Sequence, residues 1–417
     1  MMEIKRENYL QQLLIRECNG QIKIVTGVRR SGKSYLLFKI FKRTLLERGI
    51  PENHIIEAAL DALEFDELRD PHSLLAFVKS KLLDNAQYYV LLDEIQFVTR
   101  FHEVLNSLLR LDNVDVYVTG SNSRFLSSDV ITEFRGRGDE VRVRPLSFAE
   151  YRPAFNGSEE DAWNDYMTFG GLPRVLAIQG DAQKSQYLQD LFQETYMKDI
   201  VERYNIRDAG DLDDLVNVLA SAIGSLTNPT RLQNTFKSEK KSNISDKTIK
   251  NYLDYLTDAF LIDKALRWDI KGKRYINTPL KYYFVDPGLR NARLGFRQIE
   301  ENHLMENIIF NELKGRGYAV DVGLVEVRSP ERGGRQRLPL EVDFIAYRGN
   351  NKYYIQSAFL LPDAEKEAQE ARPLTHISDS FKKIIVVGNH IKLKRNEAGI
   401  TTMGVREFLL NPNSLDL

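Results

Sequence analysis

The sequence predicts an α/β protein whose amino-terminal part is built on a parallel sheet. Three stretches lead to this expectation. The β-branched run "QIKIVTG" enters a glycine-rich turn, and the helical pattern "YLLFKIFKRTLLERG" follows it. Two later apolar runs, "YYVLLDEIQFV" and "VDVYVTGSNS", lead into polar residues where a strand should end. Buried strands that alternate with helices are typical of a parallel sheet.

Composition limits the class of protein. The chain has 417 residues, enough for two to four domains, and its 42% hydrophobic and 28% charged residues are typical of a soluble globular protein. The net charge of -1 argues against a surface that binds polyanions throughout. The single cysteine, Cys18, excludes an internal disulfide and fits a reducing cytoplasm. Because the start lacks a secretory pattern and no apolar run reaches about 20 residues, we expect a cytoplasmic chain that does not enter a membrane.

The glycine-rich turn has the spacing G-x-x-x-x-G-K-S and lies between a predicted strand and a predicted helix. In this context glycines let the backbone wrap a phosphate, and the helix start presents free N–H groups to it. The predicted nucleotide-binding residues are Gly27, Arg29, Arg30, Ser31, Gly32, Lys33, Ser34 and Tyr35. Lys33 is expected to contact the β- and γ-phosphates and Ser34 to bind Mg²⁺. The alternative is a chance glycine-rich turn.

The strand "YYVLL" ends in Asp93 and Glu94. Ligand sites of α/β folds lie at the carboxyl ends of parallel strands, so these acids are expected beside the phosphate loop. Asp93 is the predicted second residue of the Mg²⁺ site, and Glu94 is the predicted base for the attacking water. The alternative is a strand that ends in two solvated acids.

Polar and basic residues follow the third strand. Ser121 or Asn122 is predicted to help place the water, although both residues also suit a helix N-cap. Arg135 or Arg137 is a candidate for the arginine that neutralises transition-state charge, in the chain's own site or in a neighbouring subunit. The alternative for both arginines is a solvated loop.

Five stretches together resemble a widespread prokaryotic ATPase family of the AAA+ superfamily, related to STAND-type and archaeal replication-initiator ATPases. They are "GVRRSGKS", "LLDEIQ", "TGSNSRFLSSD", "GRGDEVRVRPLSFAEY" and "YMTFGGLP". The resemblance covers nearly the whole chain and implies ATP hydrolysis with ATP and Mg²⁺ as ligands. It also places Arg137 near the usual arginine-finger position, which favours Arg137 over Arg135.

The predicted fold is a P-loop domain with an AAA+ type parallel sheet, followed by a helical lid, a winged helix and a restriction-nuclease-like α/β domain. The predicted bounds are 1–148, 149–225, 226–295 and 296–417. The stretch that ends at residue 225 is mostly helical by pattern. Two helices and two strands around "KGK" then predict the winged helix.

The predicted winged helix is basic. Residues 231–281 contain twelve lysines and arginines and six acids, a net charge of +6. Phosphate contacts supply most non-specific DNA affinity, so DNA is the expected partner. The predicted contacts are Lys247, Lys250, Lys271, Lys273 and Arg274. A lid or a protein-docking surface is the alternative.

The C-terminal part resembles the PD-(D/E)XK nuclease core, in which a helix Glu, a strand Asp and a Glu-x-Lys bind Mg²⁺. Glu306 and Asp343 match the first two positions. The third falls on Gln356 and Ala358, which supply neither carboxylate nor amine, so we expect the fold without cleavage. Asp343, close to Glu341, is then merely structural. The histidines show no metal-site spacing, so zinc is not expected.

The main hypothesis is a nucleotide-driven ATPase switch that acts on DNA. The alternative is a signalling or docking ATPase whose winged-helix and nuclease-like parts bind a protein partner. A residual nuclease is a third hypothesis. A homo-oligomer is compatible with an arginine that acts between subunits.

Overall fold

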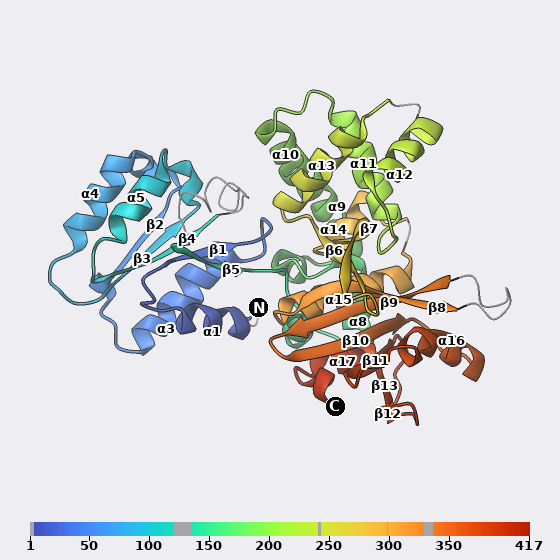
Figure 1. Cartoon of the computed structure of the whole chain (residues 1–417). Coiled ribbons are helices and arrows are strands. Elements are labelled where there is room, and N and C mark those ends of the chain that lie inside the picture. The colour runs from blue at the N-terminus through green and yellow to red at the C-terminus, as the bar shows by residue number, and fades with distance from the viewer. Residues whose placement is uncertain (1–3, 121–135, 241–242, 298, 329–336) are drawn as a thin grey trace. The chain divides into compact units, whose positions relative to one another are not determined.

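The chain forms two compact units in a computed structural model that describes residues 4–120, 136–240, 243–297, 299–328 and 337–417 (Figure 1). The first unit is Met1–Pro145 with Asp258–Phe260, and the second is Leu146–Thr257 with Leu261–Leu417. The first boundary lies close to the predicted end of the amino-terminal domain. Apart from Asp258–Phe260, the segments predicted as lid, winged helix and C-terminal domain fall together in the second unit, so their division stays a prediction.

The first unit is built on a five-stranded parallel sheet in the order β2-β3-β4-β1-β5. The strands are β1 (Ile22–Thr26), β2 (Ile55–Ala59), β3 (Tyr88–Asp93), β4 (Val114–Thr119) and β5 (Gly138–Arg142). Because all five strands run the same way, their carboxyl ends lie at one edge of the sheet. The glycine-rich turn and the acid pair follow β1 and β3, so they meet at that edge.

Helices cover both faces of this sheet (Figure 1). They are α1 (Glu7–Ile15), α2 (Lys33–Tyr35), α3 (Lys42–Glu47), α4 (Pro71–Lys81) and α5 (Phe101–Leu108). A π-helical stretch, Leu36–Phe41, joins α2 and α3 into one helix, which ends before Gly49 as predicted. This helix and α1 pack on one face, and α4 and α5 pack on the other.

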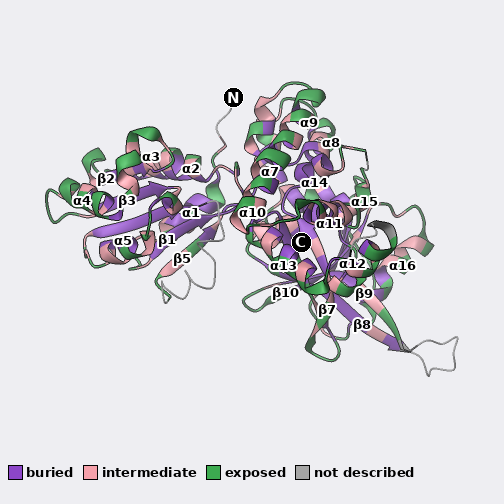
Figure 2. Ribbon diagram, turned by 90° about the horizontal axis from the view of Figure 1, so that it is seen from above, coloured by how far each residue is buried: buried purple, intermediate pink, exposed green. Residues whose placement is uncertain are grey.

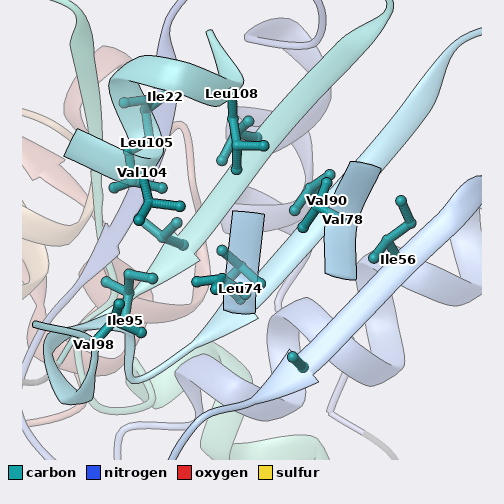
Figure 3. Close-up of a cluster of buried hydrophobic side chains, with 14 of the residues drawn as sticks. Ile22, Ile56, Leu74, Val78, Val90, Ile95, Val98, Val104, Leu105 and Leu108 are labelled. Carbon is teal, nitrogen blue, oxygen red and sulfur yellow. The ribbon is translucent and has the colours of Figure 1, made fainter. Parts of the chain in front are cut away.

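The α4–α5 face buries a continuous apolar cluster, drawn in Figure 3. Leu74 and Val78 of α4 and Leu105 and Leu108 of α5 are fully buried against strand residues such as Val90. Each such side chain contributes about 1.5–3 kcal/mol to folding. β3 and β4 are buried at every position, which explains their uninterrupted apolar runs (Figure 2).

The second unit begins with helices, as the pattern before residue 225 predicts. Its helices are α7 (Phe148–Tyr151), α8 (Glu159–Phe169), α9 (Asp181–Asp190), α10 (Lys198–Arg203), α11 (Ala209–Ser221), α12 (Pro229–Thr235), α13 (Asp246–Asp258), α14 (Pro287–Arg293), α15 (Glu301–Gly315), α16 (Ala364–Thr375) and α17 (Val405–Leu410). The lid role of the first five helices stays a prediction.

An eight-stranded mixed sheet in the order β12-β13-β11-β10-β9-β8-β6-β7 forms the rest of the second unit. Its strands are β6 (Ile262–Asp269), β7 (Arg274–Phe284), β8 (Ala319–Arg328), β9 (Arg337–Arg348), β10 (Asn351–Ala358), β11 (Lys382–Val387), β12 (Lys394–Arg395) and β13 (Ile400–Gly404). The hairpin predicted as a wing is β6–β7. β6 also pairs in parallel with β8, so the hairpin is part of the C-terminal sheet.

β7 is longer than the sequence predicts. The pattern suggests a short strand over "KRYIN", but β7 continues through Pro279 to Phe284 and pairs with β6 again there. Proline lacks the N–H that a central strand needs, and β7 lies at the edge of the sheet, where Leu280 beside the proline pairs with Thr227 instead of with a further strand. Among the described residues, no helix has the length and apolar character needed to cross a bilayer.

A buried aspartate holds two parts of the second unit together. Asp286 caps α14, where it accepts a hydrogen bond of 3.0 Å from the backbone of Leu289, and it accepts another of 2.7 Å from the backbone of Gly171. Burial raises the pKa of Asp286 to about 6, although the donating N–H groups hold it down. Asp286 therefore joins α14 to the "GGLP" turn that follows α8.

Asp286→Ala should lower the free energy of unfolding of the second unit by about 2–3 kcal/mol, because buried N–H groups lose their acceptor. Urea unfolding followed by tryptophan fluorescence measures this, since both tryptophans, Trp163 and Trp268, lie in the second unit. The control is Asp363→Ala, which removes the exposed cap of α16 and should cost about 1 kcal/mol. Equal losses in the two variants would contradict the role of Asp286.

Candidate functional site

The glycine-rich turn has the backbone geometry of a phosphate loop. Gly27 and Gly32 have φ angles of 132° and 95°, and Arg30 has a φ of 66°. A Cβ atom on Gly27 would lie 2.0 Å from the carbonyl oxygen of Val143, so only glycine fits there. The loop therefore packs against the chain just after β5 and leads into α2.

Lys33 is buried at the start of the helix. Its Nζ donates hydrogen bonds of 3.0 and 3.1 Å to the carbonyl oxygens of Gly27 and Val28. Burial lowers the pKa of Lys33 to about 8, while Glu94 and Asp93 act to raise it. Because the lysine is bonded to loop carbonyls, its charge is held inside the loop where phosphate oxygens are expected.

Asp93 lies across from Lys33 at the carboxyl end of β3. Its carboxylate accepts hydrogen bonds from the hydroxyl groups of Thr119 and Ser34. Burial raises the pKa of Asp93, and these two hydroxyl donors oppose the rise. The structure therefore brings together Ser34 and Asp93, the two residues that the sequence predicts as Mg²⁺ ligands.

Thr119, the last residue of β4, joins the two acids. Its hydroxyl donates to Asp93 and accepts a hydrogen bond of 3.0 Å from the backbone N–H of Glu94. Sequence reasoning missed Thr119 and favoured Ser121 or Asn122, which lie outside the described residues. The signal that identifies Thr119 is its place at the end of a buried strand beside β3.

Glu94 has a left-handed backbone, with φ 50° and ψ 48°, at the turn after β3. Its carboxylate accepts a hydrogen bond from the amide of Gln96. The other amide atom of Gln96, Oε1, is buried and finds no hydrogen-bond partner in the described part of the chain. Gln96 is thus a second residue that sequence reasoning missed, and it fixes the direction of the Glu94 side chain.

Arg137 lies at the opposite edge of the sheet. It precedes β5, and its carbonyl oxygen accepts a hydrogen bond of 2.8 Å from Ile22 at the start of β1. The acid pair follows the other end of the strands, about 17 Å further along the strand direction, and β3 is also three strands away from β5. Arg137 is exposed and donates a hydrogen bond of 3.1 Å to Asn106. Arg135 lies outside the described residues.

The other predicted nucleotide-binding residues of the glycine-rich turn differ in how far they are buried. Arg29 is half-buried, and its charge acts on Lys33, whereas Arg30 is exposed. The buried Ser31 hydroxyl has no hydrogen-bond partner among the residues described. The Tyr35 side chain is 48% exposed and lines a cavity of about 580 Å³ with Phe38 and residues of β2.

The predicted DNA contacts are exposed in the second unit. Lys247 and Lys250 lie on α13, and Lys271, Lys273 and Arg274 lie at the β6–β7 turn. Lys271 and Arg274 line a cavity of about 590 Å³ with Gly272 and His376. Lys281, which adds to the basic count of this segment, is instead buried and faces carboxylates.

The structure also brings together the residues that match the nuclease-like pattern. Glu306 and Asp343 both approach the Nζ of Lys281, an amine that sequence reasoning did not assign to this site. Gln356 accepts a long hydrogen bond of 3.5 Å from the backbone of Asp343, and Ala358 is buried. The structure thus places an amine from β7 beside these two acids.

The strand order, the phosphate loop and the acid pair define a P-loop domain of the AAA+ class. A family model described as an AAA domain matches residues 19–152. A second model, described as a domain of unknown function (DUF8612), matches residues 160–300.

An uncharacterized protein of Haemophilus influenzae is 35% identical to this chain over 413 residues, which cover 98% of each chain. The chain belongs to the same family as that protein. An uncharacterized protein of Methanocaldococcus jannaschii is 29% identical over 366 residues, covering 84% of this chain and 77% of the relative.

Two solved structures show weaker likeness. The Aeropyrum pernix ORC1 protein in complex with DNA has a TM-score of 0.29 and 12% identity, covering 70% of this chain and 92% of that chain. AMPPCP-bound DnaA from Aquifex aeolicus has a TM-score of 0.33 and 14% identity, covering 62% and 89%. No conclusion about this chain follows from likeness at this level.

Gly27→Ala should open the phosphate loop, because the added methyl group must displace the backbone of Val143. We expect faster hydrogen–deuterium exchange in peptides that cover β1 and residues 143–146. The control is Gly49→Ala, which has a similar positive φ of 85° but meets no atom within 4 Å. Its effect should be limited to about 1–2 kcal/mol of backbone strain. Equal exchange in the two variants would show that the contact with Val143 is unimportant.

Proposed function

We propose that this protein binds and hydrolyses ATP at the carboxyl edge of its parallel sheet. The observation that carries the proposal is the hydrogen-bonded set Asp93–Thr119–Glu94 beside the buried Lys33. A protein that only binds nucleotide needs the lysine and the loop. A second acid, held in place next to the first, is what hydrolysis adds.

Each residue has a role that follows from its position. Lys33 and the loop N–H groups hold phosphate oxygens. The Ser31 hydroxyl, which has no hydrogen-bond partner in the described part of the chain, is a further donor that a phosphate oxygen could use. Ser34 and Asp93 are the residues that would hold Mg²⁺, which when bound supplies neutralisation of phosphate charge. Glu94 takes a proton from the attacking water. Thr119 and Gln96 position Glu94 through its backbone and its carboxylate.

Arg137 takes part in this chemistry only through a second copy of the chain. It lies at the edge of the sheet where the strands begin, while Lys33 lies where β1 ends. The geometry thus favours action in a neighbouring subunit over action in the chain's own site. The corresponding test mixes Arg137→Ala and Lys33→Ala proteins, which should recover ATP hydrolysis only if the arginine acts between copies.

Glu94→Gln should bind ATP normally and hydrolyse it about 10²–10⁴-fold more slowly, because the amide accepts no proton from water. Thr119→Val should lower turnover by about 10²-fold by loosening both acids. Steady-state phosphate release and binding of a fluorescent ATP analogue separate the two effects. The matched control is Thr44→Val, since the Thr44 hydroxyl contacts only the helix carbonyl of Ile40 at 3.0 Å. Wild-type turnover by Glu94→Gln would refute the assignment of the base.

We further propose that ATP hydrolysis acts on DNA bound to the second unit. The support is the exposed basic surface formed by Lys247, Lys250, Lys271, Lys273 and Arg274. Two contacts fix the position of the β6–β7 turn. Lys271 donates a hydrogen bond of 3.0 Å to the carbonyl oxygen of Glu326, and β6 pairs with β8. Because the turn is already fixed, it loses little conformational entropy when it binds a phosphate.

Lys247→Glu with Lys250→Glu should weaken duplex DNA binding and lower the slope of log K against log salt by about 2, since each lost phosphate contact contributes about 0.9. Fluorescence anisotropy at several salt concentrations measures both quantities. The matched control is Lys79→Glu with Lys81→Glu on α4, which changes the net charge equally on the first unit. If both pairs weaken binding alike, the effect is one of net charge. If wild-type hydrolysis ignores DNA, the DNA proposal fails, and hydrolysis that depends on an added protein would support the docking alternative.

A further inference from the structure

Four charged side chains meet inside the second unit, and we call them the Lys281 cluster: Lys281, Glu306, Glu341 and Asp343. Lys281 comes from β7, Glu306 from α15, and the other two from β9. The Lys281 Nζ lies 2.8 Å from a carboxylate oxygen of Glu306, 2.8 Å from one of Glu341 and 3.7 Å from one of Asp343. Glu341 and Asp343 are two residues apart on one strand, so they share a face of the sheet.

The cluster is largely closed to solvent. The Lys281 side chain is 4% exposed, and the side chains of Asp343 and Glu306 are 11% and 13% exposed. Glu341, at 33%, forms the open side. Three carboxylates this close repel one another, and burial removes the water that would screen them. An ammonium group among the carboxylates offsets this repulsion.

The carboxylates are also fixed by neutral partners. The Tyr283 hydroxyl donates a hydrogen bond of 2.6 Å to Glu306, and the backbone N–H of Ser357 donates one of 2.8 Å to Asp343. Carboxylates from a helix and a strand, two of the three held by a neutral neighbour, are the oxygen donors that Mg²⁺, Mn²⁺ or Ca²⁺ prefers. In this protein the point where those donors converge is filled by an ammonium group.

We propose that the Lys281 cluster is a cation site whose ligand is the chain's own Lys281 ammonium, which takes the place of a divalent metal ion. The distances of 2.8 Å are those of ammonium–carboxylate hydrogen bonds, longer than the 2.0–2.6 Å or so of metal–oxygen bonds. With the Lys281 ammonium in place, no group of three or more acidic, histidine or cysteine side chains in the described part of the chain, this cluster included, is arranged to hold a metal ion.

The electrostatics of the cluster agree with this assignment. Burial lowers the pKa of Lys281, but Tyr283 and the three carboxylates together raise it well above its ordinary value, so the amine stays charged. Burial and the neighbouring Glu306 raise the pKa of Asp343 to about 8, although Lys281 acts to lower it, so a proton on Asp343 relieves part of the repulsion at neutral pH. The built-in cation therefore closes the site to metal-dependent hydrolysis and fixes the last part of β7 against α15 and β9. This holds whether or not the first unit hydrolyses ATP.

The test is Mn²⁺ binding to the full-length, nucleotide-free protein, followed by electron paramagnetic resonance of the free ion. Lys281→Ala should bind about one more Mn²⁺ per chain than wild type, because the vacated donors suit that ion. Adding Asp343→Asn should remove the extra ion. The matched control is Lys264→Ala, an exposed lysine on β6 that should leave the stoichiometry unchanged.

Three results would overturn the proposal. Lys281→Ala protein that is folded and binds no extra Mn²⁺ would show that the donors do not form a cation site. Wild-type protein that already binds Mn²⁺, and loses it on Asp343→Asn, would show that Lys281 does not exclude metal. If Lys281→Ala is unfolded without metal, Mn²⁺ should restore the fluorescence of Trp163 and Trp268 on refolding, and failure to do so would be the third.

Discussion

The candidate site depends on the parallel arrangement of β1, β3 and β4. Because these neighbouring strands run the same way, the residues that follow or end them share one edge: Lys33 after β1, Asp93 on β3 and Thr119 on β4. An antiparallel partner would have put one of the three at the far edge. The helices on both faces hold this arrangement, because they bury the apolar side chains on both sides of the strands. The apolar core thus sets the geometry of the polar site.

The two units treat buried charge in different ways. In the first, burial lowers the pKa of Lys33 and raises that of Asp93, and Lys33 is bonded to backbone carbonyls. The Lys33 ammonium and the Asp93 carboxylate lie near each other, and both remain available to bind a ligand. In the second, Lys281 is bonded directly to Glu306 and Glu341, so the charges satisfy one another. Both sites contain an amine and carboxylic acids. The site in the first unit is open to a ligand because its amine is bonded to backbone carbonyls, whereas the Lys281 cluster is closed because its amine is bonded to its own acids.

The sequence predicts the parts of the site that are local. The phosphate loop and the Asp93–Glu94 pair lie in short segments whose strand and helix flanks are visible in the pattern, and the structure places them as expected. Thr119 was missed because its role depends on which strand lies beside β3. Lys281 was counted as surface charge, because only the long-range pairing of β6 with β8 and the packing of α15 turn it inward. The edge at which Arg137 lies follows from the register of β5 with β1, which a single sequence does not reveal.

The short stretch after β5 gives the candidate site a direct covalent route to the second unit. Val143 donates a hydrogen bond of 2.8 Å to the last residue of β1, Thr26, and its carbonyl oxygen packs against Gly27 of the phosphate loop. Three residues later, Leu146 donates one of 2.7 Å to Gly171, in the turn that Asp286 also binds. Along the chain, only Arg144 and Pro145 separate the residue that contacts Gly27 from the residue that contacts Gly171. Within the second unit, the β6–β8 pairing makes the basic hairpin part of the C-terminal sheet.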